Sequence, residues 1–203
     1  MNGKLVVDMF MTLDGVMQGP GEPKEDTEGN FTLGGWQVPY LDEESGKLIS
    51  EDIERIDALL LGRKTYEIFA AYWPKAPSDD PIAVTLNSVP KYVASRSLKS
   101  VEWNNSNLIH GDVPNEIERL KKEYAEVHLI GSGNFLQTLL KNELVDEFNL
   151  WVYPILLGTG KHIFADGTIP TALSLESSRI FDNGTLLLRY ARTGKPTFGS
   201  MAL

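Results

Sequence analysis

Apolar runs of strand length alternate with segments of helical period along most of the 203 residues, and this alternation constrains the fold more than any other feature of the chain. The pattern is typical of an α/β domain, because helices that connect parallel strands pack on the faces of the sheet. We predict strands at residues 4–11, 58–61, 91–94, 107–109, 126–130 and 146–155, and helices at residues 43–56, 63–72, 114–124 and 134–141.

The last third of the chain has a different pattern. Residues 174–181 and 185–193 are joined by Asp182-Asn183-Gly184, a turn sequence that tolerates positive φ and favours an antiparallel hairpin. The sheet should therefore begin as an α/β sheet and end antiparallel. No linker, internal repeat or low-complexity segment interrupts the sequence, and we predict a single domain over residues 1–203.

A long segment rich in glycine and proline, residues 12–40, separates the first strand from the first helix. Its composition excludes a regular helix, and a loop of this length inside a compact domain is usually functional or disordered. Phe31 and Trp36 favour a loop that packs over the rest of the protein, and Trp36 is our candidate for a substrate-binding side chain. A mobile surface loop is the alternative.

The composition limits the ligands that the chain can take. With 19 Lys and Arg against 28 Asp and Glu, the formal charge is −9, which argues against nucleic acid or an anionic membrane surface as a partner. The absence of cysteine excludes a disulfide scaffold and a thiolate site, and no stretch approaches the ~20 apolar residues of a membrane span. We expect a cytoplasmic protein with a small-molecule substrate, in which any anionic ligand meets a local cluster of cations.

Three corners, each at the end of a predicted strand, combine small residues with polar or basic ones. The first is Gly62-Arg63-Lys64-Thr65, where two cations and a hydroxyl stand at the start of a helix. A helix N-terminus has unpaired N–H groups and a partial positive charge, so this corner indicates phosphate binding. A solvated first helical turn is the alternative, although such turns normally favour acidic residues.

The second and third corners have related chemistry. Ser95-Arg96 offers a hydroxyl and a planar guanidinium, which suit a phosphate monoester. The third corner comprises Gly131, Ser132, Gly133, Asn134 and Phe135. Its glycines would let backbone N–H groups approach a pyrophosphate, although Leu136 stands where the dinucleotide fingerprint has its third glycine. A tight turn that simply needs glycine is the alternative reading of this corner.

In combination, the three corners resemble the cofactor-binding elements of dihydrofolate reductases. The segment Met11-Thr12-Leu13-Asp14-Gly15 and the stretch between residues 144 and 160 resemble the reductase domain of the bifunctional deaminase-reductases of riboflavin synthesis. This resemblance extends over nearly the whole chain. It implies a dihydrofolate reductase-like three-layer α/β fold, in which a central mixed sheet has helices on both faces and ends in the antiparallel hairpin. It also implies NADPH as the hydride donor and, as in many members, a homodimer.

The resemblance assigns a role to each corner. The first would flank the cofactor phosphates, and the third would hold the pyrophosphate. Ser95 and Arg96 would hold the adenosine 2′-phosphate, which favours NADP over NAD. Asp14 is the candidate for a catalytic or orienting group, because it follows the first strand where the nicotinamide should lie. An Asp-Gly turn is its alternative.

Three functions remain open on this basis. The first is an NADPH-dependent reductase that transfers a hydride to a pterin-like, pyrimidine or carbonyl substrate. The second is a standalone 5-amino-6-(5-phosphoribosylamino)uracil reductase of riboflavin synthesis. The third is a non-catalytic NADP-binding dimeric protein, because Ile130 occupies a position that is typically acidic in riboflavin reductases. His110, His128 and His162 show no metal spacing, and we expect each to cap, pack or face solvent.

Overall fold

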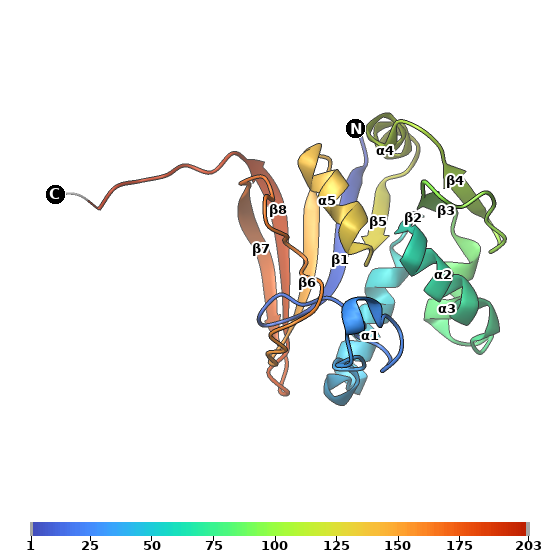
Figure 1. Cartoon of the computed structure of the whole chain (residues 1–203), viewed down its shortest axis with the longest axis horizontal. Coiled ribbons are helices and arrows are strands. Elements are labelled where there is room, and N and C mark those ends of the chain that lie inside the picture. Colours follow the sequence, from blue (N-terminus) through green and yellow to red (C-terminus); the bar gives the residue numbers. More distant parts are fainter. Residues whose placement is uncertain (1, 202–203) are drawn as a thin grey trace.

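The computed structural model describes residues 2–201 and contains one mixed sheet of eight strands, in the order β4-β3-β2-β5-β1-β6-β8-β7 (Figure 1). The strands are β1 (Lys4–Thr12), β2 (Ala58–Gly62), β3 (Lys91–Ala94), β4 (Ser106–Ile109), β5 (Glu126–Ile130), β6 (Glu147–Tyr153), β7 (Ala172–Ile180) and β8 (Leu186–Gly194). The first six are parallel, whereas β8 pairs antiparallel with β6 and with β7. The predicted change from a parallel to an antiparallel sheet is therefore confirmed.

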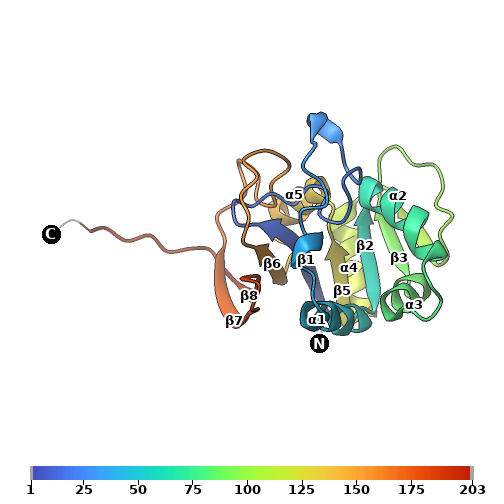
Figure 2. The same cartoon turned by 90° about the horizontal axis from the view of Figure 1, so that it is seen from below.

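Helices cover both faces of this sheet (Figure 2). One face carries α1 (Glu43–Glu54), α2 (Arg63–Tyr72) and α3 (Pro81–Ser88), and the other carries α4 (Val113–Glu123) and α5 (Gly133–Lys141). Short 3₁₀ turns lie at Glu28–Asn30, Val38–Tyr40 and Trp73–Lys75. The predicted α/β fold with helices on both sides of a mixed sheet is thus confirmed. Within residues 2–201, none of the helices has the length and apolar character needed to span a membrane.

The alternation of residues along β1 sorts the two faces of the sheet. Leu5, Val7 and Met9 point to the α4–α5 face and belong to the largest buried cluster. Asp8 and Phe10, which alternate with them, point to the opposite face, beneath α1. Asp8 is therefore a charged residue in the middle of a central strand, on a face that a helix covers.

Aspartate side chains cap three of the helices. Asp42, Asp80 and Asp112 accept hydrogen bonds from backbone N–H groups in the first turns of α1, α3 and α4. The periodicity of the sequence does not predict α3, because the helix is only eight residues long and rich in β-branched residues. Its start nevertheless has a recognisable signal, since Asp80 is followed by Pro81 at a position where proline favours helix initiation.

The segment between β1 and α1 packs on the protein, as its aromatic residues predict. Phe31 and Trp36 are each 5% exposed and cluster with Trp151 and Tyr153 of β6. The indole N–H of Trp36 donates a hydrogen bond to the Gln18 carbonyl at 2.8 Å. The loop therefore covers the carboxyl-terminal half of β6 on the α1 face of the sheet.

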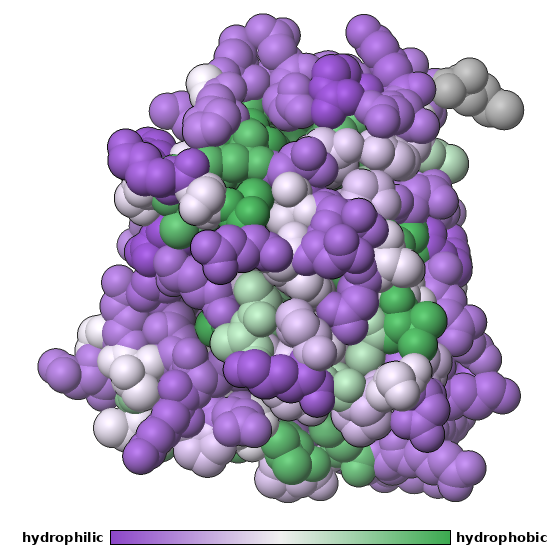
Figure 3. Space-filling model, turned by 90° about the vertical axis from the view of Figure 1, so that its right-hand side faces the viewer, coloured by the Kyte–Doolittle hydropathy of each residue, from purple (hydrophilic) through white to green (hydrophobic). Residues whose placement is uncertain are grey.

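The surface is largely polar, in keeping with the charge of −9. On the side that carries β3, β4 and α3, apolar residues form small, separate patches (Figure 3). At the opposite edge of the sheet, β7 exposes Leu175 and Ile180, and the chain after β8 extends away from the sheet with Phe198 exposed (Figure 1).

Candidate active site

The carboxyl ends of β2, β3 and β5 bring the three predicted corners to one edge of the sheet. Gly62 at the end of β2 pairs with Ala94 at the end of β3, so Ser95 follows directly beside the first corner. On its other side β2 pairs with β5, whose last residue, Ile130, leads into the third corner. The corners therefore converge, as the parallel order of these strands requires.

The first and third corners interlock. The backbone N–H of Gly62 donates to the Ser132 hydroxyl at 2.7 Å, and this hydroxyl donates in turn to Oγ1 of Thr65 at 2.8 Å. A Cβ atom at position 62 would lie 3.0 Å from Ser132 and 3.3 Å from Phe135, so glycine allows this close approach. Gly131 has a φ of 62°, a left-handed conformation that favours glycine.

The helices that begin at these two corners lack the caps found elsewhere in the molecule. Neither α2 nor α5 has a side-chain cap or an acidic residue in its first turn, whereas α1, α3 and α4 each have an aspartate cap. The first N–H groups of both helices have no intrahelical partner and carry the positive end of the helix dipole. Two such termini, joined through Ser132, suit an anion with two linked charges.

The second corner offers an unengaged cation. The Ser95 hydroxyl accepts hydrogen bonds from the backbone N–H groups of Ser97 and Leu98, at 3.2 and 3.0 Å, which shapes a tight turn after β3. Arg96 in this turn is exposed, and no ion pair or hydrogen bond joins it to another residue in the described part of the chain. Its guanidinium is therefore free to meet an external anion beside the first corner.

The cations of the first corner are paired with carboxylates. Arg63 contacts Glu67, one helical turn further along α2, at 3.0 Å. Lys64 instead contacts Glu28 of the long loop, and Lys161 binds the same carboxylate. Lys161 and then Lys64 lower the pKa of Glu28 to about 2. A phosphate at this corner would therefore compete with Glu28 for Lys64.

Asp14 fastens the segment after β1 to the segment after β6. Its carboxylate accepts hydrogen bonds from the Thr12 hydroxyl at 2.5 Å and from the backbone N–H groups of Leu157 and Gly158 at 3.1 and 2.7 Å. The Thr12 bond, helped by the two backbone bonds, lowers the pKa of Asp14. This geometry favours the orienting role over proton donation, because the group stays ionised at neutral pH. Its catalytic role stays a prediction.

Other predicted site residues lie in different surroundings. Trp36 is buried in the loop cluster, with its ring centroid 5.6 Å from that of Tyr153, so its predicted contact with substrate stays untested. Phe135 is 8% exposed and belongs to the buried cluster beneath α5, and its Cβ lies close to Gly62 of the first corner. Asn134 at the start of α5 is exposed.

A row of polar side chains that the sequence analysis does not single out crosses the sheet face beneath α1. This polar strip consists of Asp8 on β1, His128 on β5, Asn149 on β6 and Arg189 on β8. The Asp8 carboxylate accepts a hydrogen bond from the Asn149 side-chain amide at 2.7 Å, and it is hydrogen-bonded to Nδ1 of His128 at 2.6 Å. Arg189 donates to the Asn149 oxygen at 3.1 Å. The strip is thus one continuous hydrogen-bonded chain across four strands.

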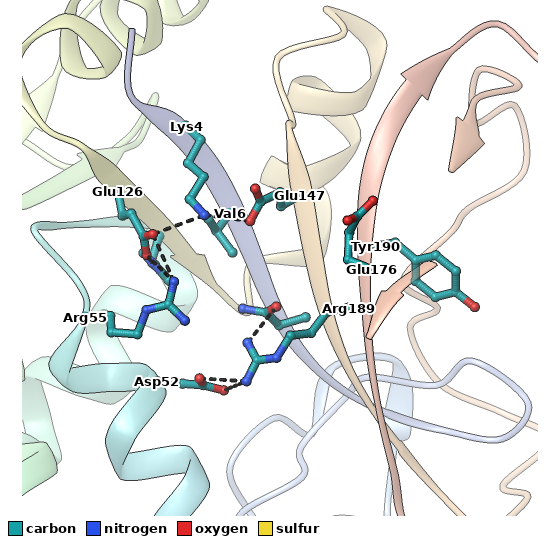
Figure 4. Close-up of a pocket in the computed structure, with 11 residues that line it drawn as sticks. Lys4, Val6, Asp52, Arg55, Glu126, Glu147, Glu176, Arg189 and Tyr190 are labelled. Atoms are coloured by element: carbon teal, nitrogen blue, oxygen red, sulfur yellow. Dashed lines mark hydrogen bonds and ion pairs between the residues drawn. The ribbon is translucent and has the colours of Figure 1, made fainter. Parts of the chain in front are cut away.

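Charged residues at both ends of the polar strip line a cavity of about 240 Å³ between α1 and the sheet (Figure 4). At one end Arg189 contacts Asp52 of α1 at 2.8 Å. At the other, Nε2 of His128 meets Glu126 at 3.2 Å, and Glu126 also binds Lys4 and Arg55 at 3.1 and 3.0 Å. The strip is therefore anchored by ion pairs on α1, β1 and β5.

Burial and neighbouring charges shift the pKa values of this network in opposite directions. Burial alone would lower the pKa of His128, but the carboxylates of Asp8 and Glu126 outweigh it and raise the pKa. Glu126 has a pKa of about 2, because Lys4, His128 and Arg55 outweigh the effect of its burial. Burial raises the pKa of Asp52 despite its pairing with Arg189. The two carboxylates thus favour the charged form of His128.

A sequence signal for the strip does exist. Asp8 and His128 are polar residues at the centres of strands whose neighbours are apolar, in KLVVDMFMT and EVHLI. Their meeting depends on the pairing of β1 with β5, in which Val6 lies opposite His128. That pairing joins residues about 120 positions apart, so the contact cannot be read from either strand alone.

The structure shows no group of residues suited to a metal ion within residues 2–201.

Comparison with known proteins agrees with this geometry. A family model described as the RibD C-terminal domain matches residues 3–187. The chain belongs to the RibD C-terminal domain family. The match includes β1, the three corners and the polar strip up to β6, so the site residues predicted from the sequence fall within the family region and Arg189 lies just beyond it.

The relatives cover nearly all of this RibD C-terminal domain protein. The uncharacterized protein YyaP of Bacillus subtilis (strain 168) is 27% identical over 195 residues, which make up 94% of this chain and 96% of YyaP. A putative riboflavin biosynthesis protein from Shewanella sp. PV-4 superposes with a TM-score of 0.68 at 23% identity, covering 95% of this chain and 99% of that one. The dihydrofolate reductase of Enterococcus faecalis, solved in complex with NADP(H), superposes with a TM-score of 0.60 at 16% identity, covering 95% of this chain and 98% of that one. These similarities confirm the predicted dihydrofolate reductase-like fold.

Proposed function

We propose that this protein is an NADPH-dependent reductase that transfers a hydride to a small pterin-like, pyrimidine or carbonyl substrate. The observation that carries the proposal is the pair of uncapped helix N-termini, α2 and α5, at the ends of adjacent parallel strands and joined through Ser132. Membership of the RibD C-terminal domain family supports a reductase, and the free guanidinium of Arg96 supports the phosphorylated cofactor.

The donors at the sheet edge fit such a cofactor. Backbone N–H groups at the starts of α2 and α5 would bind the pyrophosphate, with the Thr65 hydroxyl beside them. Ser95 and Arg96 would bind the adenosine 2′-phosphate, because an arginine fork matches two phosphate oxygens. An NAD site usually has a carboxylate in that position for the ribose hydroxyl, and this corner has none.

The protein itself must hold the substrate, exclude water and supply a proton. A bound nicotinamide cofactor supplies the hydride that reduces a C=N or C=O group. Asp14 fixes the segment after β1 against residues 157 and 158, which keeps this edge of the site in a single conformation. The long loop, packed through Phe31 and Trp36, covers the neighbouring sheet face and restricts the access of water.

Two alternatives share the fold. A standalone 5-amino-6-(5-phosphoribosylamino)uracil reductase is favoured by the family match and by the similarity to the Shewanella riboflavin biosynthesis protein. A non-catalytic NADP-binding protein is favoured by Ile130, an apolar residue directly before the third corner. Both alternatives keep the cofactor site and differ in what is reduced.

Two measurements on the purified protein test the proposal. Fluorescence titration with NADPH and NADH should give clear preference for NADPH, and equal or undetectable binding of both would contradict the cofactor assignment. NADPH oxidation is then followed with dihydrofolate, dihydropterins, flavins, quinones and the aminopyrimidine phosphate of riboflavin synthesis. Turnover of any of them supports a reductase, and turnover of the last alone identifies the riboflavin enzyme. Tight NADPH binding without any turnover supports the non-catalytic alternative.

We also propose that the protein is a cytoplasmic homodimer. The edge strand β7 exposes Leu175 and Ile180, which are 51% and 78% exposed, and a second copy of this edge is the partner that would cover them. The lack of cysteine is compatible with a reducing compartment. Sedimentation analysis should show a dimer for the wild type and dissociation in the Ile180→Glu variant. A variant dimer as stable as that of the wild type would contradict the proposal.

A further inference from the structure

Burying the polar strip on a sheet face costs desolvation free energy. Charged and amide groups taken out of water lose their hydration, and apolar side chains of similar volume would usually stabilise the fold at least as well. The rest of the α1 face follows that rule, because apolar clusters lie on both sides of the strip. All four side chains of the strip are hydrogen-bonded, so the network is fully formed in the folded protein.

Within this network, His128 bridges two carboxylates. Its side chain is 3% exposed, with Nδ1 at 2.6 Å from Asp8 and Nε2 at 3.2 Å from Glu126. An imidazolium in this position can release its Nδ1 proton to Asp8 and keep the proton on Nε2. Glu126, which also binds Arg55, accepts from Nε2 and favours this charged form. The geometry thus places a transferable proton beside Asp8.

Asp8 lies between His128 and the third corner. Its partner in the register with β5 is Ile130, and its carbonyl accepts the backbone N–H of Gly131 at 3.4 Å. Its side chain is 18% exposed, against 3% for His128, so the carboxyl group is the more accessible of the two. Asp8 is therefore a titratable group close to the candidate cofactor edge on the α1 face.

We propose that Asp8 is the carboxyl group that protonates the reduced substrate, and that Nδ1 of His128 supplies this proton. The inference rests on the proposed reductase function and deepens it. Asp8 acts as the catalytic acid, whereas His128 and Asn149 are positioning residues that hold it. Asn149 occupies one carboxylate oxygen of Asp8, and His128 occupies the other.

The proton and electron balance is simple. The carbon of the C=N or C=O group gains the hydride, its π electron pair moves to the nitrogen or oxygen, and that atom takes a proton from Asp8. Asp8 draws this proton from Nδ1 of His128, which leaves the imidazole neutral with its other proton on Nε2. After the product leaves, the partly exposed Asp8 takes a proton from solvent and returns it to Nδ1. Each turnover consumes one NADPH and one proton, reduces the substrate by two electrons and releases NADP⁺.

The charged groups around His128 set the direction of its pH dependence. Asp8 and Glu126 face it from β1 and β5, and both favour the imidazolium. Lys4 of β1 and Arg55, directly after α1, are neutralised by Glu126, and Arg189 of β8 is neutralised by Asp52 of α1. The neighbouring strand β2 contributes only apolar residues and glycine. His128 should therefore stay protonated above the pH at which a free histidine loses its proton, near 6.5.

The first test needs no turnover, and its deciding measurement uses the wild-type protein. NMR titration of isotope-labelled imidazole nitrogens should show His128 protonated on both nitrogens at pH 6.5, with exposed His110 as the internal reference. In Asp8→Asn, the His128 titration should move to lower pH. A neutral His128 ring at pH 6.5 in the wild type would overturn the relay.

The second test measures catalysis with whichever compound of the reductase panel the wild type reduces. His128→Gln, which can still donate a hydrogen bond to Asp8, and Asp8→Asn should each lower kcat about 100-fold or more. The dissociation constant for NADPH should change less than about twofold, because general acid catalysis acts on the chemical step alone. The wild-type kcat should fall as the pH rises through the His128 titration, and His128→Gln should lose this limb. His110→Gln is the matched control and should behave as the wild type.

The outcomes separate this inference from the proposed function. A wild type that binds and oxidises NADPH, together with a His128→Gln variant that keeps the wild-type kcat and pH limb, overturns the relay alone. Equal losses of NADPH affinity and kcat in Asp8→Asn indicate a structural role and also overturn it. A wild type that neither binds nor oxidises NADPH contradicts the proposed function itself, and the relay with it.

Discussion

Replacing Arg96 by alanine should weaken NADPH binding roughly 10- to 100-fold and leave NADH binding almost unchanged. Arg96 is exposed and makes no ion pair or hydrogen bond within residues 2–201, so its removal costs the folded protein little. A hydrogen bond to a charged group contributes about 1.5–3 kcal/mol, and each 1.4 kcal/mol is about a tenfold change in affinity. The loss should fall on the cofactor that carries the 2′-phosphate, because NADH has no group for Arg96 to bind.

The matched control for this substitution is Lys99→Ala. Lys99 is an exposed cation three residues further along, so its removal lowers the local positive charge by the same amount. Fluorescence titrations of wild type, Arg96→Ala and Lys99→Ala with both cofactors separate a specific contact from general electrostatic attraction. Similar losses for NADPH and NADH in Arg96→Ala, or an equal loss in Lys99→Ala, would refute the assignment of the second corner to the 2′-phosphate.

Three further predictions concern the surroundings of the site. Glu28→Gln should tighten NADPH binding a few-fold in the same titration, because Lys64 loses a carboxylate that competes with phosphate; weaker binding would show that Glu28 holds the loop in its binding conformation. Asp14→Ala should lower the free energy of unfolding by about 1 kcal/mol and the Tm by about 2–4 °C; an unchanged Tm in differential scanning calorimetry would contradict the clamp to residues 157 and 158. The stabilisation by His128 should be complete below pH 6.5 and decline as the pH rises through its raised folded-state pKa; a denaturant series that shows the same decline in His128→Gln would contradict it.

The sequence predicts the strands, the hairpin and the edge of the sheet where the corners meet, because those depend on periodicity and on the order of parallel strands. It does not predict α3, whose eight residues are too few to show a helical period, although Asp80-Pro81 marks the start. It names the residues of the corners but not their pairing: the bond from Gly62 to Ser132 joins positions 70 residues apart.

The polar strip shows the same limit more sharply. His128 has no metal or nucleophile spacing in the sequence, and the expectation that it caps, packs or faces solvent does not separate these roles. Its place in the polar strip depends on Asp8, which lies 120 residues away and meets it through the pairing of β1 with β5. A buried charge cluster formed across strands depends on register, and register is set by the whole sheet.

A crystal structure of the protein with NADPH bound is the most direct test of the central claim. We expect the pyrophosphate to contact the N-termini of α2 and α5, the 2′-phosphate to contact Ser95 and Arg96, and the nicotinamide to lie on the α1 side near Asp8. A cofactor bound away from the carboxyl ends of β2, β3 and β5, or bound there with its 2′-phosphate distant from Arg96, would contradict it.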